Sequence, residues 1–167
     1  MNRTLIENLI EHHEGRKNSV YKDSLGNLSA GVGCLLMSDV NGELIANQRV
    51  VEIFNQLGID FDAVCKGEIS LTDQQVEDIF QIQLNDAIRD SQAQFLEFDS
   101  YPDAVQAVIV DMEFNLGAEK YAEFVDTIAA IKDRNWIKAA AEMRDSLWCG
   151  QVGNRCADDC KLMESAA

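Results

Sequence analysis

The stretch EGRKNSVYKDSLGNLSAGVGCLL, residues 14–36, decides the fold that the sequence predicts. It places one carboxylate, Glu14, at the end of a helix and a second, Asp23, where a short strand enters a turn. The hydroxyl of Ser29 and two closely spaced glycines follow on the returning strand. The stretch therefore predicts a helix followed by a hairpin that carries two carboxylates and a hydroxyl.

The helix before this stretch is predicted over residues 1–14. Thr4 and Glu7 match a T-x-x-E capping box, in which each side chain satisfies a free amide at the helix start. The apolar face repeats at helical spacing and comprises Ile6, Leu9, Ile10 and His13. Gly15 is a left-handed stop, so Glu14 lies in the last turn, where the helix dipole disfavours an anion. A carboxylate in that place is easier to protonate, especially when it is partly buried.

The hairpin is predicted from its strand and turn residues. Residues 20–21 favour a first strand, residues 24–27 a turn, and residues 28–32 the returning strand. A third short strand is expected near residues 34–36. Asp23 lies where the first strand enters the turn, so we expect it to be wetter than the carboxylate at the helix end.

Two carboxyl groups in different surroundings are what glycoside hydrolysis requires. One, here Glu14, stays protonated and gives its proton to the leaving oxygen. The other, here Asp23, stays ionised and directs water or stabilises the cationic transition state, with Ser29 helping to hold the water. The alternative is that Glu14 and Asp23 are surface charges, as most acidic residues close in sequence are.

The pattern E-G-x(5)-Y-K-D, a turn, then S-x-G-x-G-x-L-L resembles the signature of the phage-type lysozymes, the endolysins of glycoside hydrolase family 24. The resemblance implies that Glu14 is the general acid and Asp23 the second catalytic residue. Ser29 stands where the family carries a catalytic threonine; serine keeps the hydroxyl but lacks the methyl group that helps fix the rotamer. The resemblance also implies that Leu35 contacts substrate.

Similar segments lie in the second half of the chain. Residues 111–117 resemble the family's N-x-x-F-x-x-G segment, which implies that Phe114 and Asn115 line the substrate cleft. Periodicity alone would place Phe114 in the core. Thr127 aligns with a substrate-facing residue of some members, and Glu142 takes a position where an amide is known.

Arg155 follows Gly153-Asn154, which resembles the family's P-N-R with glycine in place of proline. The resemblance implies that this arginine pairs with the catalytic glutamate and supports it in place. The positive charge would also lower the pKa of that glutamate. Without the motif, Arg155 would be read as a surface arginine.

The predicted fold is α+β, a two-lobed lysozyme-like fold in which a long helix joins a small β-hairpin lobe to a larger all-helical lobe. The chain, 1–167, is expected to be one domain. Residues 15–71 would form the small lobe, residues 72–91 the connecting helix, and residues 92–167 the helical lobe, on which residues 1–14 pack. Thr72 and Gln75 form a second capping box at the start of the connecting helix.

Other helices are predicted from their apolar spacing at residues 43–57, 102–117, 119–132 and 134–147. The first of these has an expected core of Leu44, Ile45, Val51, Phe54 and Leu57. Residues 59–71 are expected to be irregular, with Phe61 and Val64 buried.

The formal net charge of −15 argues against a nucleic-acid partner, because nothing supplies a basic patch for phosphates. It also repels an anionic cell wall, most of all at low salt. No stretch is long and apolar enough to span a bilayer, and the N-terminus lacks the pattern of a secretory signal. We therefore expect synthesis in the host cytoplasm and action on the wall or in the periplasm after release, for which the resemblance suggests a holin.

The five cysteines, at positions 34, 65, 149, 156 and 160, are odd in number and irregular in spacing. This pattern is not typical of a disulfide framework, so reduced, half-buried thiols are expected. Cys156 and Cys160 would share a helix face beside Asp159, but His12 and His13, the two histidines, lie far away in sequence. A tetrahedral ligand set is missing, and no metal site is expected.

Three functions follow from these observations. The first is an enzyme, a monomeric muramidase that needs no cofactor and hydrolyses the β-1,4 bond between N-acetylmuramic acid and N-acetylglucosamine in peptidoglycan. The second is a lysozyme-like module that binds glycan strands and turns over poorly, suggested by the acidic surface and by serine in place of threonine. The third, an acidic structural or interaction protein, has only the charge in its favour.

Overall fold

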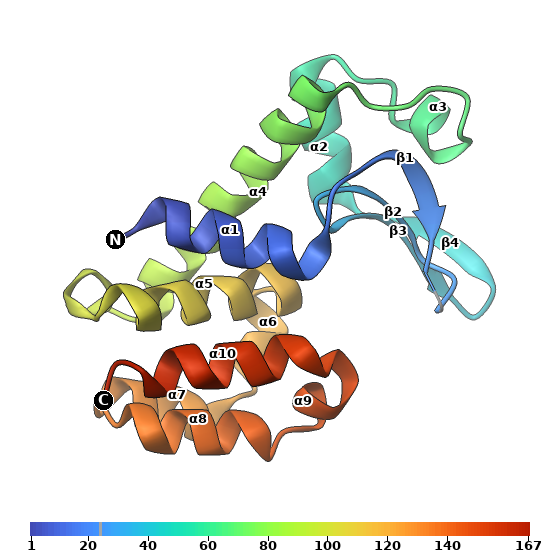
Figure 1. Cartoon of the computed structure of the whole chain (residues 1–167). Coiled ribbons are helices and arrows are strands. Elements are labelled where there is room, and N and C mark those ends of the chain that lie inside the picture. Colours follow the sequence, from blue (N-terminus) through green and yellow to red (C-terminus); the bar gives the residue numbers. More distant parts are fainter. Residues whose placement is uncertain (24) are drawn as a thin grey trace. The chain divides into compact units, whose positions relative to one another are not determined.

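The structure is a computed structural model that describes residues 1–23 and 25–167 (Figure 1). Its elements in chain order are α1 (Arg3–Glu14), β1 (Lys17–Lys22), β2 (Leu28–Gly31), β3 (Cys34–Val40), β4 (Glu43–Ala46), α2 (Gln48–Leu57), α3 (Phe61–Cys65), α4 (Asp73–Gln94), the 3-10 helix η1 (Phe98–Ser100), α5 (Asp103–Leu116), α6 (Ala118–Tyr121), α7 (Val125–Lys132), α8 (Trp136–Arg144), α9 (Leu147–Val152) and α10 (Asn154–Glu164). Helices with one small antiparallel sheet confirm the α+β prediction.

The chain forms two compact units. One, here called the sheet unit, comprises Glu14–Gln83, and the other, the helical unit, comprises Met1–His13 with Leu84–Ala167. The boundary falls directly before Glu14, so α1 belongs to the helical unit except for its last residue.

The sheet unit is built on an antiparallel sheet in the order β1-β2-β3-β4. Tyr21 pairs with Ser29, and Ser29 pairs with Leu35, so one residue from each of three strands lies in a single row across the sheet. Gly31 and Gly33, with φ of 65° and 59°, make the turn between β2 and β3 in a left-handed conformation that glycine adopts most easily. The predicted turn residue Ser24 lies outside the described residues.

Burial on β3 alternates with the period of a strand. Cys34 and Leu36 are fully buried, whereas Leu35 between them is half-buried. Helix α2 packs against β3, and α3 packs against β1. The buried apolar core of this unit comprises Ala30, Val32, Cys34, Leu36, Val50, Ile53, Phe54, Ile59, Val64, Leu71, Val76, Ile79 and Phe80.

The prediction of one helix over residues 43–57 is wrong in its first part. Asn41 and Gly42, with φ of 57° and 88°, close a tight hairpin, and the chain returns as β4 before α2 begins. The expected core residues Leu44 and Ile45 are consequently 36% and 50% exposed. The side chain of Asn47 accepts a hydrogen bond from the Val50 amide at 3.4 Å and fixes the true helix start.

The rest of that segment is partly as predicted. Phe54 is fully buried, Val51 and Leu57 are half-buried, and Gly58 ends α2 in the left-handed conformation. Residues 59–71, predicted to be irregular, contain the short helix α3, because the Asp60 side chain caps its first turn. Val64 is buried as expected, and Phe61 is half-buried.

The two predicted capping boxes have different outcomes. At α1 the cap is Asn2, whose Oδ1 accepts the Leu5 amide at 3.1 Å, because Arg3 begins the helix one residue before Thr4. Glu7 forms an ion pair with Arg3 at 3.0 Å. At α4 the predicted box is confirmed: the Thr72 amide donates to Gln75 Oε1 at 2.9 Å, and the Gln75 amide donates to Thr72 Oγ1 at 3.1 Å.

Helix α4 has 22 residues and continues beyond the predicted end near Ser91 to Gln94. Charged and amide side chains recur along its length, in keeping with a helix whose faces are not uniformly apolar. Among the described residues, none of the helices combines the length and apolarity that crossing a membrane requires.

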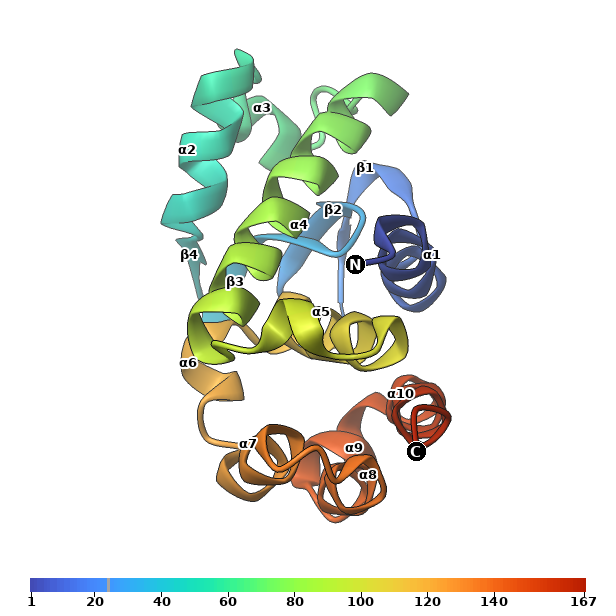
Figure 2. The same cartoon turned by 90° about the vertical axis from the view of Figure 1, so that its left-hand side faces the viewer.

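In the helical unit, α7 packs against α8, and α10 packs against α8, α9 and α5; Figure 2 shows α7, α8 and α10 side by side. Aromatic rings also pack together in this unit. The Phe95 ring is 6.2 Å from those of Tyr101 and Tyr121, and the Tyr101 ring meets Trp136 edge-on at 5.6 Å. Helix α5 is buried along most of its length.

The helices predicted at residues 119–132 and 134–147 are both interrupted. The first divides into α6 and α7, because Phe124 leaves helical geometry and places its ring edge-on to both Tyr121 and Trp148 at 6.1 Å. The second ends at Arg144, and Ser146 caps the separate helix α9.

The expectation of reduced thiols is wrong for two cysteines, since Cys149 and Cys156 form a disulfide. Gly153, with φ of 56°, turns the chain between α9 and α10 and brings the two Cα atoms within 5.1 Å. Cys34, Cys65 and Cys160 are free. Cys156 and Cys160 share a face of α10 as predicted, with 3.7 Å between their sulfurs.

Glu113 on α5 predicts a pH dependence of stability. Its side chain is 3% exposed, and neither carboxylate oxygen has a hydrogen-bond partner within the described part of the chain. Burial, and then the charge of Asp90, raise its pKa to about 7. Between the ordinary pKa of 4.5 and this value the folded state holds a proton that the unfolded state has lost, so stability falls as pH rises through that window.

We expect the Glu113→Gln variant to gain ~1–3 kcal/mol of unfolding free energy relative to wild type between pH 4.5 and 8, because the amide never ionises. Urea unfolding at a series of pH values measures this difference. Glu119→Gln, at an exposed position of α6, is the matched control, and its unfolding free energy should vary with pH as that of wild type does. The same pH dependence of unfolding free energy in Glu113→Gln and wild type would contradict the raised pKa of Glu113.

Candidate active site

Glu14 is the last residue of α1, as predicted, and Gly15 follows with φ of 68°. Its half-buried carboxyl group lies directly against the backbone of Gly33 in the turn between β2 and β3. A Cβ atom at Gly33 would stand 2.5 Å from Glu14 Oε2, closer than real Cβ contacts come. The second glycine of the G-x-G pattern therefore makes the space in which the Glu14 carboxyl lies.

Asp23 closes the turn that follows β1. Its Oδ1 accepts the backbone amides of Leu25 and Asn27, both at 2.9 Å, and its Oδ2 accepts the side-chain amide of Asn27 at 2.9 Å. Burial raises the pKa of Asp23, but these hydrogen bonds from the Asn27 side chain and from backbone amides outweigh it and hold the pKa below its ordinary value. The group is thus held as a carboxylate near neutral pH.

Tyr21 is the residue of this site that sequence reasoning left without a role. It lies opposite Ser29 in the register of β1 and β2, and Ser29 lies opposite Leu35. Burial, and then the negative charge of Glu14, raise the pKa of the Tyr21 hydroxyl; a side-chain hydrogen bond with Ser29 lowers it, and Asp23 raises it further. The tyrosine ring therefore lies within electrostatic reach of both carboxylates.

In the sheet unit, Glu14, Asp23 and Ser29 thus all act on the pKa of Tyr21, and Leu35 lies in the same cross-strand row as Tyr21 and Ser29. The signal in the sequence was the Y-K-D order: a tyrosine two residues before the turn carboxylate pairs with the serine of the returning strand. Strand register was needed to recognise it.

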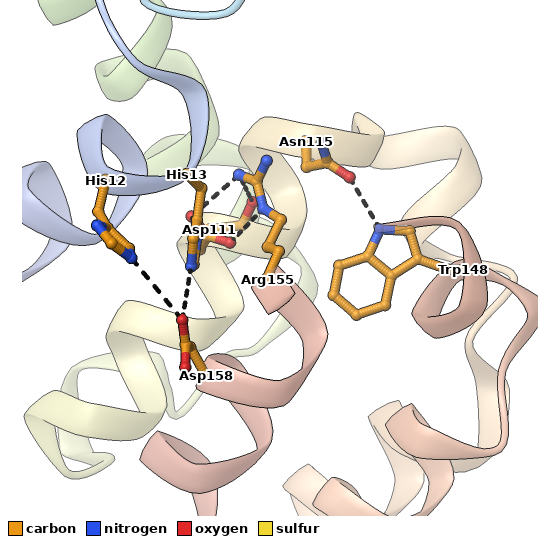
Figure 3. Close-up of polar contacts among 7 residues, drawn as sticks. All are labelled: His12, His13, Asp111, Asn115, Trp148, Arg155 and Asp158. Atoms are coloured by element: carbon orange, nitrogen blue, oxygen red, sulfur yellow. Dashed lines mark hydrogen bonds and ion pairs between the residues drawn. The ribbon is translucent and has the colours of Figure 1, made fainter. Parts of the chain in front are cut away.

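The other predicted substrate contacts, Phe114, Asn115 and Thr127, belong to the helical unit. Asn115 Oδ1 accepts the indole N–H of Trp148 at 2.8 Å (Figure 3). Thr127 and Trp148 line a hollow of about 580 Å³. Phe114 is half-buried on α5 and is not one of its lining residues.

That hollow is open and bordered by residues of α5, α6, α7, α8 and α9 and their connections. Its lining includes Leu116, Phe124, Thr127, Glu142, Ser146 and Trp148. An aromatic wall with hydroxyl and carboxylate groups beside it is suited to a sugar or a similar polar ligand with an apolar face.

Arg155 is buried in the helical unit and forms a two-point ion pair with Asp111. Its Nε lies 2.7 Å from Asp111 Oδ2, and its Nη2 lies 3.0 Å from Asp111 Oδ1 (Figure 3). Burial raises the pKa of Asp111, but the hydrogen bond with His13 and the charge of Arg155 lower it by more, so the carboxylate stays ionised. The role of Arg155 toward Glu14 stays a prediction.

Helices with a small antiparallel sheet, and a carboxylate at a helix end beside a hairpin, define the class of lysozyme-like α+β proteins. The chain is similar to two proteins of Dictyostelium discoideum. It is 22% identical over 154 residues to probable T4-type lysozyme 2, covering 90% of this chain and 88% of that protein. It is 24% identical over 153 residues to probable T4-type lysozyme 1, with the same coverage of both chains.

No protein-family model matches the chain. The two similarities extend over most of its length and agree with the fold, and together they support a T4-type lysozyme-like protein.

Gly33→Ala tests the packing of Glu14 against the turn. The added methyl group must displace the Glu14 carboxyl, and φ of 59° strains any side chain. We expect the glycan hydrolysis proposed below to fall by about 100-fold, at a stability cost of about 1–2 kcal/mol. Initial rates and urea midpoints measure the two effects.

Gly58→Ala is the matched control for this substitution. Gly58 has a similar φ of 67°, but nothing lies within 4 Å of where its Cβ would stand. It should lose comparable stability and keep its activity. Equal activity of the two variants would show that the Gly33 contact does not position the acid.

Proposed function

We propose that this protein is a muramidase that hydrolyses the β-1,4 bond between N-acetylmuramic acid and N-acetylglucosamine in bacterial peptidoglycan. The observation that carries the proposal is the Glu14 carboxyl lying against the Gly33 turn of the same small sheet whose strands position Asp23 and Ser29. The similarity to proteins named T4-type lysozymes supports the same activity. Host-cell lysis by a monomer, after release through a holin, is the setting we propose.

In the proposed reaction Glu14 is the general acid. Its proton passes to the glycosidic oxygen as the bond to the anomeric carbon breaks, which leaves a neutral alcohol instead of an alkoxide. The contact with Gly33 limits the positions open to its carboxyl group, so the proton is presented in one direction.

Asp23 and Ser29 would hold the attacking water. An ionised carboxylate has about four lone-pair positions, and three on Asp23 already accept hydrogen bonds from Leu25 and Asn27. One position on Oδ2 remains, and a water bound there would be aimed by a carboxylate that cannot rotate. An inverting reaction of this kind needs about 6.5–9.5 Å between the two carboxyl groups to admit the water.

Tyr21 would orient the Ser29 hydroxyl. Serine lacks the methyl group that restricts the rotamer of threonine, but Tyr21, which lies opposite Ser29 in the strand register, would supply a restraint of another kind. Leu35, one strand further along the same row, would contact the sugar ring. In the helical unit, the hollow beside Thr127 and Trp148 would bind a sugar, with Asn115 holding the Trp148 ring and Phe114 as a further predicted contact.

The alternative is a lysozyme-like module that binds glycan and turns over poorly. It is favoured by the charge of −15, and by the use of Asp23 to close its own turn. If Asp23 only stabilises its own turn, the same carboxylate would be present in a glycan-binding module as well as in an enzyme.

Release of reducing ends from purified peptidoglycan separates these two functions. We expect wild type to release them at a rate that rises with salt, because screening weakens repulsion from the anionic wall. Glu14→Gln should be slower by about 10²–10⁴-fold, since the amide has no proton to transfer. Both proteins should sediment equally with the insoluble glycan. If both bind and both are inert at every salt concentration, the binding module is the correct function.

Two substitutions at Ser29 test the water-holding hydroxyl. Ser29→Ala removes the hydroxyl and should reduce kcat by about tenfold or more, whereas Ser29→Thr restores the family's residue and should match or exceed wild type. Tyr21→Phe removes the restraint. It should lower kcat more in the wild-type protein than in the Ser29→Thr variant, and a double-mutant cycle measures that difference. Equal rates for the alanine and threonine variants would remove Ser29 from the mechanism.

A further inference from the structure

His13 lies between two carboxylates in the helical unit. Its Nδ1 is 3.3 Å from Asp111 Oδ1, and its Nε2 is 3.8 Å from Asp158 Oδ2 (Figure 3). The side chain is 4% exposed, and Nε2 has no hydrogen-bond partner among the described residues. A neutral imidazole whose Nδ1–H faces Asp111 presents a lone pair at Nε2. That lone pair faces the Asp158 carboxylate, an arrangement that a cation between the two groups would stabilise.

His12 points to the same carboxylate oxygen. Its Nε2 is 3.9 Å from Asp158 Oδ2, and Figure 3 shows both histidine contacts converging there. One ligand atom from each of the three residues lies within 4.8 Å of the others. His12 and His13 come from the last turn of α1 and Asp158 from α10, so the fold joins residues that are far apart in sequence.

We propose that His12, His13 and Asp158 bind a divalent transition-metal cation such as Zn²⁺. Two imidazole nitrogens and one carboxylate oxygen are a ligand set for such ions, with water in the fourth position. Ligand atoms around tetrahedral zinc are about 3.4 Å apart, so the two histidine–Asp158 pairs need to close from 3.8–3.9 Å and the two imidazole nitrogens from at most 4.8 Å. His12 is 72% exposed and Asp158 is 39% exposed, which leaves them free to make these movements and leaves the site open to solvent.

Two surrounding features favour the site, and a third leaves its carboxylate oxygen available. Asp111 accepts from His13 Nδ1 and would orient the ring, as carboxylates behind zinc-bound histidines do. The C-terminal end of α1 carries partial negative charge, which attracts a cation. Lys161 lies 3.7 Å from the other oxygen of Asp158, Oδ1, and so leaves Oδ2 to the metal.

A second set, His13 with Asp111 and Asp159, is a weaker candidate although its ligand atoms are equally close. The Arg155 guanidinium already occupies both oxygens of Asp111. Asp159 is completely buried, so an ion would have no open route to it. The outer set is therefore the one we assign.

Calorimetric titration with Zn²⁺ tests the site, using disulfide-intact protein in a Cys65→Ser background that removes the half-buried thiol. We expect one ion per chain, and tetrahedral absorption bands when Co²⁺ replaces Zn²⁺. Ca²⁺ and Mg²⁺, which prefer oxygen ligands, should bind at least about tenfold more weakly.

Two surface variants decide whether the named residues hold the ion. His12→Gln and Asp158→Asn should each weaken Zn²⁺ binding by about tenfold or more. Asp133→Asn removes one exposed carboxylate elsewhere in the same unit and should bind like the parent. The proposal is overturned if the parent binds no Zn²⁺, or if both variants bind it as tightly as the parent does.

Discussion

The close approach of the Glu14 carboxyl to the backbone of Gly33 is the constraint on which the candidate site depends. It joins the end of a helix to the turn between two strands, and it requires a residue without a side chain at a left-handed position. The acid can then take few positions. The same turn sets the start of β3 and, through strand pairing, the row that contains Ser29 and Tyr21.

The two candidate catalytic carboxylates of the sheet unit, Glu14 and Asp23, lie in different environments. Asp23 is surrounded by amide donors that keep it ionised, and it serves both the turn and the proposed chemistry. Glu14 instead lies on a helix end beside the tyrosine ring. Two acidic residues of the helical unit differ in the same way. Arg155 and His13 keep Asp111 ionised, whereas burial raises the pKa of Glu113.

Local signals made much of the fold predictable, and long-range contacts explain most of what was missed. The stop at Gly15, the short strand near residues 34–36 and the capping box at Thr72 each depend on neighbours in sequence, and the structure confirms them. Ile45 was misplaced because its spacing also fits a helix, and only pairing with β3 makes it a strand residue. The role of Tyr21 and the position of Asp158 beside two histidines needed strand register and helix packing, which sequence spacing does not contain.

The bond between Cys149 and Cys156 has a consequence for the residues next to the two cysteines. Trp148, which lines the hollow, precedes Cys149, and Arg155, which pairs with Asp111, precedes Cys156. The disulfide therefore restrains the backbone next to both residues. Such bonds persist in oxidising compartments and open where glutathione keeps thiols reduced. The rigidity of this corner of the protein is therefore set by the redox state of its surroundings as well as by its own packing.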